Sequence, residues 1–187
     1  KTIKKNGMGP GIARNLGIKK ANSKFLIFLD VDDYIEIKYL NQLIEYCKKF
    51  KNNFIFLGIK TSKKISPYLN YSKNNLKNFF RKSNNMLAIA KVIKKQFLIK
   101  NNLIFSKGIF EDIFFTFKCH FYNDKKIDYF SKKIYVKKEN PNSITNSKKT
   151  LNHIKHKFNA FKAVDFFLRK KNYKIFNKLI KDIQHRW

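Results

Sequence analysis

The chain has 187 residues, of which 43% are hydrophobic and 20 are Phe, so it can bury the core of one domain and is not expected to be disordered. Its two cysteines, Cys47 and Cys119, are too few and too unpatterned for a disulfide framework or a zinc site, which indicates a reducing compartment. No apolar run approaches the roughly 20 residues of a membrane-spanning helix. The first residue is Lys, which leaves open whether another segment precedes it.

The formal net charge of +30 has two explanations. Clustered Lys and Arg attract polyanions such as nucleic acid or an anionic membrane. The excess, however, is mostly Lys spread along the whole chain, and it comes with abundant Asn, Ile and Phe, which A- and T-rich codons encode. Base composition can therefore account for much of the charge without a selected partner.

The first part of the chain alternates between helical and strand patterns. A loop punctuated by Gly and Pro leads into a helix-compatible stretch at 14–21, and the apolar run at 25–29 predicts a strand covered on both faces. Residues 36–50 have apolar positions at helical spacing, and residues 54–59 predict a second buried strand. This alternation is typical of an α/β domain with a largely parallel sheet.

The later part of the chain is less regular. Residues 60–85 are polar and predict a long loop, followed by a helix near 93–101 and a turn at Gly108. Glu111 and Asp112 then open a Phe-rich helix. The remaining predicted elements are two short strands at 126–130 and 133–137 and two basic amphipathic helices within 150–187.

Two pairs of carboxylates can carry chemistry. Asp30 and Asp32 follow the strand at 25–29, where ligands bind in open α/β sheets, and their spacing on an extended strand end places both side chains on one side for a hard cation. Asp residues after a strand also commonly cap the next turn, so this pair alone does not decide the role. Glu111 and Asp112 lie in a first helical turn, where the helix dipole stabilises anions whether or not they are catalytic.

Three segments resemble the family-2 glycosyltransferases in that family's order and spacing. Residues 6–35, NGMGPGIARNLGIKKANSKFLIFLDVDDYI, are similar to the signature in which Asn, Gly and Ala-Arg-Asn-x-Gly precede a strand and Asp-x-Asp-Asp. Residues 90–115, AKVIKKQFLIKNNLIFSKGIFEDIFF, resemble the acceptor-side segment with its Glu-Asp pair. Residues 126–145, KIDYFSKKIYVKKENPNSIT, resemble the strand pair and Ser-Ile-Thr ending that usually follow. The chain is therefore identified as a member of this family over 6–145.

The resemblance implies an α/β fold of the Rossmann-like GT-A type in an inverting nucleotide-diphospho-sugar transferase. It places a partial GT-A domain at 1–147 and a basic amphipathic helical tail at 148–187. Members of the family normally begin with a strand, a loop and a further strand that hold the nucleotide base and ribose, and none of these precedes Asn6. The expectation is therefore a GT-A fold that lacks its first strands.

The resemblance also implies roles for individual residues. Asp32 is expected to bind Mn²⁺ or Mg²⁺, and Asp30 is expected to contact the metal or the nucleotide ribose. Asp112 matches the general base, whereas Glu111 is expected to orient the acceptor or support the loop. Arg14 faces the nucleotide diphosphate or forms an ion pair with the acidic cluster, and both possibilities stay open.

The implied function is transfer of a sugar from a nucleotide donor, expected to be a UDP-sugar, to a glycan or glycolipid acceptor in bacterial surface polysaccharide or lipooligosaccharide assembly. The expected place is the cytoplasm, with a peripheral contact to the inner face of an anionic membrane through the tail, and packing of the tail onto the domain is the alternative. A late His assists metal or diphosphate binding in some members, so His153 and His156 are candidates, with a helix-surface role as the other possibility. Two further alternatives are a non-catalytic remnant and a basic nucleic-acid-binding protein, although no nucleic-acid recognition module is evident.

Overall fold

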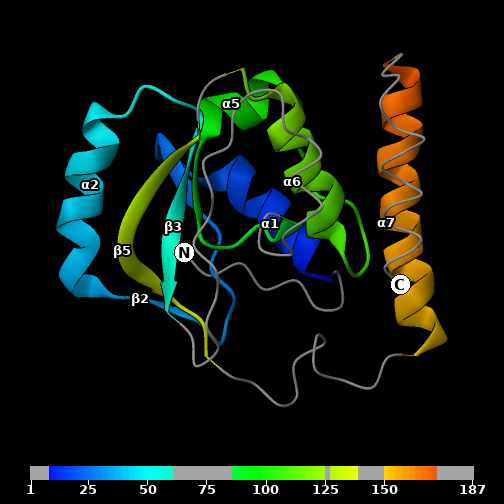
Figure 1. Cartoon of the computed structure of the whole chain (residues 1–187), viewed down its shortest axis with the longest axis horizontal. Coiled ribbons are helices and arrows are strands. Elements are labelled where there is room, and N and C mark those ends of the chain that lie inside the picture. Colours follow the sequence, from blue (N-terminus) through cyan, green and yellow to red (C-terminus); the bar gives the residue numbers. More distant parts are fainter. Residues whose placement is uncertain (1–8, 61–85, 125–126, 139–149, 172–187) are drawn as a thin grey trace.

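The computed structural model describes residues 9–60, 86–124, 127–138 and 150–171. A five-stranded sheet lies between α2 on one face and α1, α5 and α6 on the other, and α7 forms an outer layer beside α6 (Figure 1). The strands are β1 (Phe25–Ile27), β2 (Tyr34–Ile35), β3 (Phe54–Lys60), β4 (Lys91–Lys94) and β5 (Asp128–Val136). The helices are α1 (Gly9–Lys20), the 3-10 turn η1 (Ile37–Tyr39), α2 (Leu40–Lys49), α5 (Lys95–Lys100), α6 (Glu111–Tyr122) and α7 (Leu151–Lys170).

The strands are arranged in the order β1-β4-β3-β5-β2. Among the described strands, β3 and β5 form the one parallel pair of neighbours, whereas β1–β4, β3–β4 and β2–β5 are antiparallel. The expectation of a largely parallel sheet is therefore wrong. The difference arises because β4 inserts between β1 and β3, and its residues include the first positions of the helix predicted near 93–101, which begins instead at Lys95.

The two strands predicted at 126–130 and 133–137 are one continuous strand, β5. The pairing of β5 with β3 shifts register around Gly58, because Leu57 pairs with Phe130 whereas Gly58 pairs with Lys133. The exposed residues at 131–133 accommodate this bulge, and a Cβ at Gly58 would lie 2.4 Å from the backbone oxygen of Lys132. The polar interruption of the apolar pattern therefore marks a β-bulge rather than a turn.

Alternation along β3 divides the core between the two faces of the sheet. Phe54 and Phe56 pack with α1, α5 and α6, whereas Ile55 and Leu57 pack with α2. Successive strand residues point to opposite faces, so a run without polar residues is explained by helices on both sides. This confirms the prediction of a buried strand at 54–59.

The tail begins with α7, which packs against α6. Val164 and Leu168 are buried with Phe117 of α6, and Phe167 packs on the same cluster. Ile154 and Phe158, two further apolar residues of this helix, are exposed. The second tail helix and the loop predicted at 60–85 lie almost wholly outside the described residues. Within the part of the chain that the structure describes, no helix is long and apolar enough to cross a membrane.

Candidate functional site

The first pair of predicted site carboxylates lies on a turn that follows β1. The strand ends at Ile27, and the backbone N–H of Asp33 donates to the carbonyl of Asp30 at 3.1 Å, closing a turn over 30–33. Asp30 and Asp32 are both partly exposed on this turn. They therefore lie beyond the strand end, rather than on an extended strand as their spacing suggested.

Arg14 connects this turn to the second carboxylate pair. Its Nη2 donates to Asp30 Oδ1 at 2.8 Å, and its Nη1 donates to the carboxylate of Glu111. The Glu111 side chain is only 7% exposed, so its charge is compensated mainly by the guanidinium. The structure thus brings together three predicted site residues from three separate segments, and the ion pair considered for Arg14 is present.

The position of Arg14 depends on close docking of α1 onto the segment before α6. The side-chain amide of Asn15 exchanges two hydrogen bonds with the backbone of Phe105, at 2.8 and 2.9 Å. Gly11 lies so close to the same segment that a Cβ would be 2.4 Å from the backbone oxygen of Ser106 and 2.9 Å from Glu111 Cγ. Because Gly11 has no side chain, α1 can lie this close to Ser106 and Glu111.

Asp112 is held at the start of α6 in a partly desolvated position. Phe110, immediately before the helix, has a left-handed backbone with φ 62°, which turns the chain sharply into Glu111 and Asp112. Burial and the neighbouring Glu111 carboxylate raise the pKa of Asp112 to about 6, while Arg14 and Lys91 act in the opposite direction. Such a carboxyl is ionised at neutral pH and is more basic than an ordinary Asp, which suits a general base.

The third carboxylate after β1, Asp33, has a structural role. It is 8% exposed, and its Oδ2 accepts a hydrogen bond from the hydroxyl of Tyr135 at 2.7 Å. Its Oδ1 accepts from the backbone N–H of Lys138 at 3.1 Å. Burial raises the pKa of Asp33. These bonds fix the 30–33 turn to β5 and hold Asp30 and Asp32 at the end of β1.

Lys91, at the start of β4, was not identified as a site residue from the sequence. Its side chain is fully buried, donates to the carbonyl of Leu87 and lies 4.9 Å from the ring of Phe56. Burial lowers the pKa of Lys91 to about 7, and its charge favours the ionised form of Asp112. The available signal was a Lys within an otherwise apolar run at 88–93, since a buried Lys normally has a partner.

The two histidine candidates lie near the start of α7. His153 forms a capping box with Thr150, in which the Thr150 hydroxyl lies 2.8 Å from His153 Nδ1, so its contact is structural. His156 lies against Gly108 in the loop before Glu111, where a Cβ would be 3.2 Å from its Nδ1. Among the described residues, no group of three or more His, Cys, Asp or Glu side chains could hold a metal. A metal contact of His156 stays a prediction.

The arrangement of the sheet, the carboxylates after β1 and the acidic start of α6 is that of a GT-A nucleotide-sugar transferase fold. The crystal structure of S. aureus TarS 1–349 in complex with UDP-GlcNAc superposes with a TM-score of 0.62 at 20% identity, covering 79% of this chain and 44% of that one. The family model described as Glycosyl transferase family 2 matches residues 2–114. The chain therefore belongs to glycosyl transferase family 2, as its motifs indicated.

Two curated relatives extend the comparison. The chain is similar to a cholesterol galactosyltransferase of Borreliella burgdorferi, with 24% identity over 185 residues that cover 88% of this chain and 51% of the relative. It is also similar to the poly(ribitol-phosphate) beta-N-acetylglucosaminyltransferase TarP of Staphylococcus aureus, with 29% identity over 124 residues that cover 62% of this chain and 38% of TarP. The chain thus spans about half or less of the length of these relatives.

Proposed function

We propose that this chain carries the donor-phosphate and base residues of an inverting glycosyltransferase that uses a UDP-sugar. The observation that supports this most strongly is the joining of Asp30, Arg14 and Glu111 by ion pairs beside the basic carboxylate Asp112. The same fold is found in TarS, which was solved with UDP-GlcNAc. Arg14 and the 30–33 turn would face the donor diphosphate.

A divalent cation fits the two carboxylates after β1. Mg²⁺ and Mn²⁺ are commonly held by one or two carboxylates together with substrate phosphates, so a full ligand set from the protein is not required. Asp32 would hold the metal, with Asp30 as a second ligand or a ribose contact, because Asp30 also accepts from Arg14. When bound, the metal supplies neutralisation of the charge that develops on the diphosphate leaving group.

The transfer itself is assigned to Asp112. Its carboxylate would lie within about 3 Å of the acceptor hydroxyl and take the proton as that oxygen attacks the anomeric carbon. The diphosphate leaves from the opposite face, so one displacement inverts the anomeric configuration. Glu111 is buried against Arg14 and acts by holding the guanidinium, and a direct contact with the acceptor stays a prediction.

The acceptor is proposed to be a glycan or glycolipid of the bacterial surface. The relatives named above act on a sterol and on poly(ribitol-phosphate), which supports an acceptor of the lipid or polymer class. We propose that the protein acts in the cytoplasm, at the inner face of the cytoplasmic membrane, because lipid-linked acceptors are found there.

The first test is calorimetric titration of UDP into the chain with and without Mn²⁺. We expect Mn²⁺-dependent binding of UDP that is lost in Asp32→Asn, because the proposed contacts are to the metal and the diphosphate. Glu45→Gln, an exposed carboxylate on α2, serves as the matched control and should bind UDP normally. Binding that does not depend on the metal, or an equal loss of binding in the control, would contradict the proposal.

A further inference from the structure

Helix α7 presents two opposite faces. Its inner face carries Val164 and Leu168, which are buried against Phe117 of α6. Three large apolar side chains point away from this contact, Leu151, Phe158 and Phe166, with exposed fractions of 85%, 53% and 69%. At 3.6 residues per turn, these three positions lie within about 80° of one another around the helix. The outer face of α7 therefore carries three apolar side chains over about 22 Å of helix, from Leu151 to Phe166, that no described segment covers.

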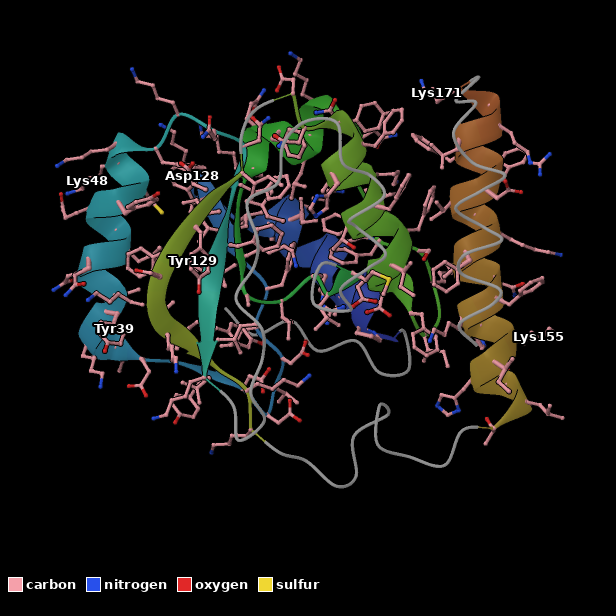
Figure 2. All side chains as sticks on the ribbon, viewed as in Figure 1. Tyr39, Lys48, Asp128, Tyr129, Lys155 and Lys171 are labelled. Atoms are coloured by element: carbon pink, nitrogen blue, oxygen red, sulfur yellow. The ribbon has the colours of Figure 1, made fainter. Side chains whose placement is uncertain are left out.

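The same outer face is cationic. Lys155 and Lys162 alternate along the chain with the three apolar positions, and Arg169 follows Phe166; all three lie within the same span of about 80° around the helix. Lys155 is labelled on the side of α7 away from α6 (Figure 2). The Nζ of Lys162 lies 4.9 Å from the centroid of the Phe158 ring, so charge and apolar surface are adjacent. Asp165 is the only acidic residue of the helix and is paired with Arg169 at 3.0 Å.

We propose that the outer face of α7, defined by Leu151, Phe158 and Phe166 with Lys155, Lys162 and Arg169, binds the surface of an anionic lipid bilayer. The choice of a bilayer rests on the proposed function, which requires access to lipid-linked acceptors, whereas the surface itself follows from exposure and charge. The apolar side chains enter the acyl boundary, while the long cationic side chains between them extend to the lipid phosphates.

Other occupants of this face fit less well. A second copy of the chain would bring two proteins of net charge +30 together, which Coulomb repulsion opposes. A nucleic-acid backbone would satisfy the cations but would leave Leu151, Phe158 and Phe166 without an apolar partner. A bilayer with anionic headgroups satisfies both kinds of side chain.

The test is co-sedimentation of the full chain with vesicles, without any donor sugar. Vesicles of phosphatidylglycerol and phosphatidylcholine in equal parts should bind the protein, and vesicles of phosphatidylcholine alone should bind it about tenfold less. The triple variant Leu151→Gln/Phe158→Gln/Phe166→Gln should lose about tenfold or more of the binding to anionic vesicles. The matched control is Ile37→Gln/Ile99→Gln/Ile104→Gln, which removes three exposed apolar side chains from other elements and should leave binding unchanged.

Several outcomes would overturn the inference. The membrane surface is excluded if the control variant loses as much vesicle binding as the α7 variant, or if the α7 variant binds vesicles as well as the wild type. It is also excluded if the α7 residues cause the protein to sediment without vesicles, or if duplex DNA binding depends on them as strongly as vesicle binding does. Calorimetric UDP binding is measured on the same samples. Failure of UDP binding alone contradicts the proposed function, and failure of vesicle binding alone contradicts only the membrane surface.

Discussion

The guanidinium of Arg14 and the carboxylate of Glu111 form a largely buried ion pair that joins α1 to the first turn of α6. Replacing Arg14 by Met leaves the Glu111 charge without its main compensation. Because an uncompensated buried charge is costly, we expect Arg14→Met to lower the free energy of unfolding by about 3 kcal/mol. Urea denaturation at neutral pH measures this loss.

Two further variants separate the ion pair from other effects of the substitution. Arg14→Met/Glu111→Gln removes both charges and should recover most of the lost stability. Arg169→Met removes an arginine from the exposed pair with Asp165 and should cost no more than about 0.5 kcal/mol. A double variant as unstable as Arg14→Met would show that Arg14 acts through packing on Phe105, whose ring centroid lies 5.4 Å away, and not through charge.

Two glycines of α1 should respond in opposite directions to alanine. At Gly11, the new Cβ would meet the Ser106 oxygen at 2.4 Å and displace Glu111, so Gly11→Ala should destabilise the fold by about 2 kcal/mol. Nothing lies within 4 Å of a Cβ at Gly17, so Gly17→Ala should stabilise the helix by about 0.5–1 kcal/mol. Urea midpoints compare the two variants directly. Equal shifts of the same sign would refute the close approach at Gly11.

The buried strand β3 could be predicted from its sequence because an apolar run of that length needs cover on both faces. The position of β4 could not, because periodicity reports burial and not the identity or direction of the neighbouring strand. The same limit applies to β5, where exposed residues at 131–133 resemble a turn but form a bulge opposite Gly58. Long-range pairing decides these features, and it is not encoded in any single segment.

The candidate site shows a similar division. An ion pair of Arg14 with the acidic cluster was one of two possibilities that the sequence left open, and the structure shows Arg14 paired with both Asp30 and Glu111. The apolar run around Lys91 indicated its burial but not its contacts, and the bond between Asp33 and Tyr135 could not be predicted. Both depend on side chains from strands whose arrangement the sequence does not specify.

Tyr135→Phe tests whether Asp33 anchors the 30–33 turn. The change removes the hydroxyl that donates to Asp33 Oδ2 and leaves a buried carboxylate with fewer bonds, so it should cost about 1–2 kcal/mol at neutral pH. Loss of this bond raises the pKa of Asp33 further, so the cost should shrink at acidic pH, where Asp33 is protonated. Tyr129→Phe, on the same strand but more exposed, is the control for urea denaturation. If Tyr135→Phe lowers the stability equally at neutral and acidic pH, the hydrogen bond from Tyr135 does not depend on the charge of Asp33.

Asp112→Asn should increase stability while abolishing transfer. The pKa of Asp112 is raised from its ordinary value of 3.8 to about 6, so between these values the folded protein binds more protons at this site than the unfolded chain. The free energy of unfolding therefore falls as the pH rises from 3.8 to about 6, and the full loss of stability is present above about pH 6. The neutral amide avoids the penalty, and the variant should be more stable than the wild type by about 1–3 kcal/mol at about pH 8, but by little near pH 4.

The rate of sugar transfer should also depend on the ionisation of Asp112, but it should rise with pH where the stability falls. A general base must be ionised, so release of UDP from the donor in the presence of acceptor should rise about tenfold per pH unit below about pH 6 and level off above it. Asp112→Asn should show no such pH-dependent rate, yet should still bind UDP with Mn²⁺, whereas Asp124→Asn, an exposed carboxyl beyond α6, should keep the wild-type profile. If Asp112→Asn retains transfer, another residue is the general base. If the variant is more stable and has lost transfer, the burial of the Asp112 carboxylate lowers the stability of the fold while it serves the reaction.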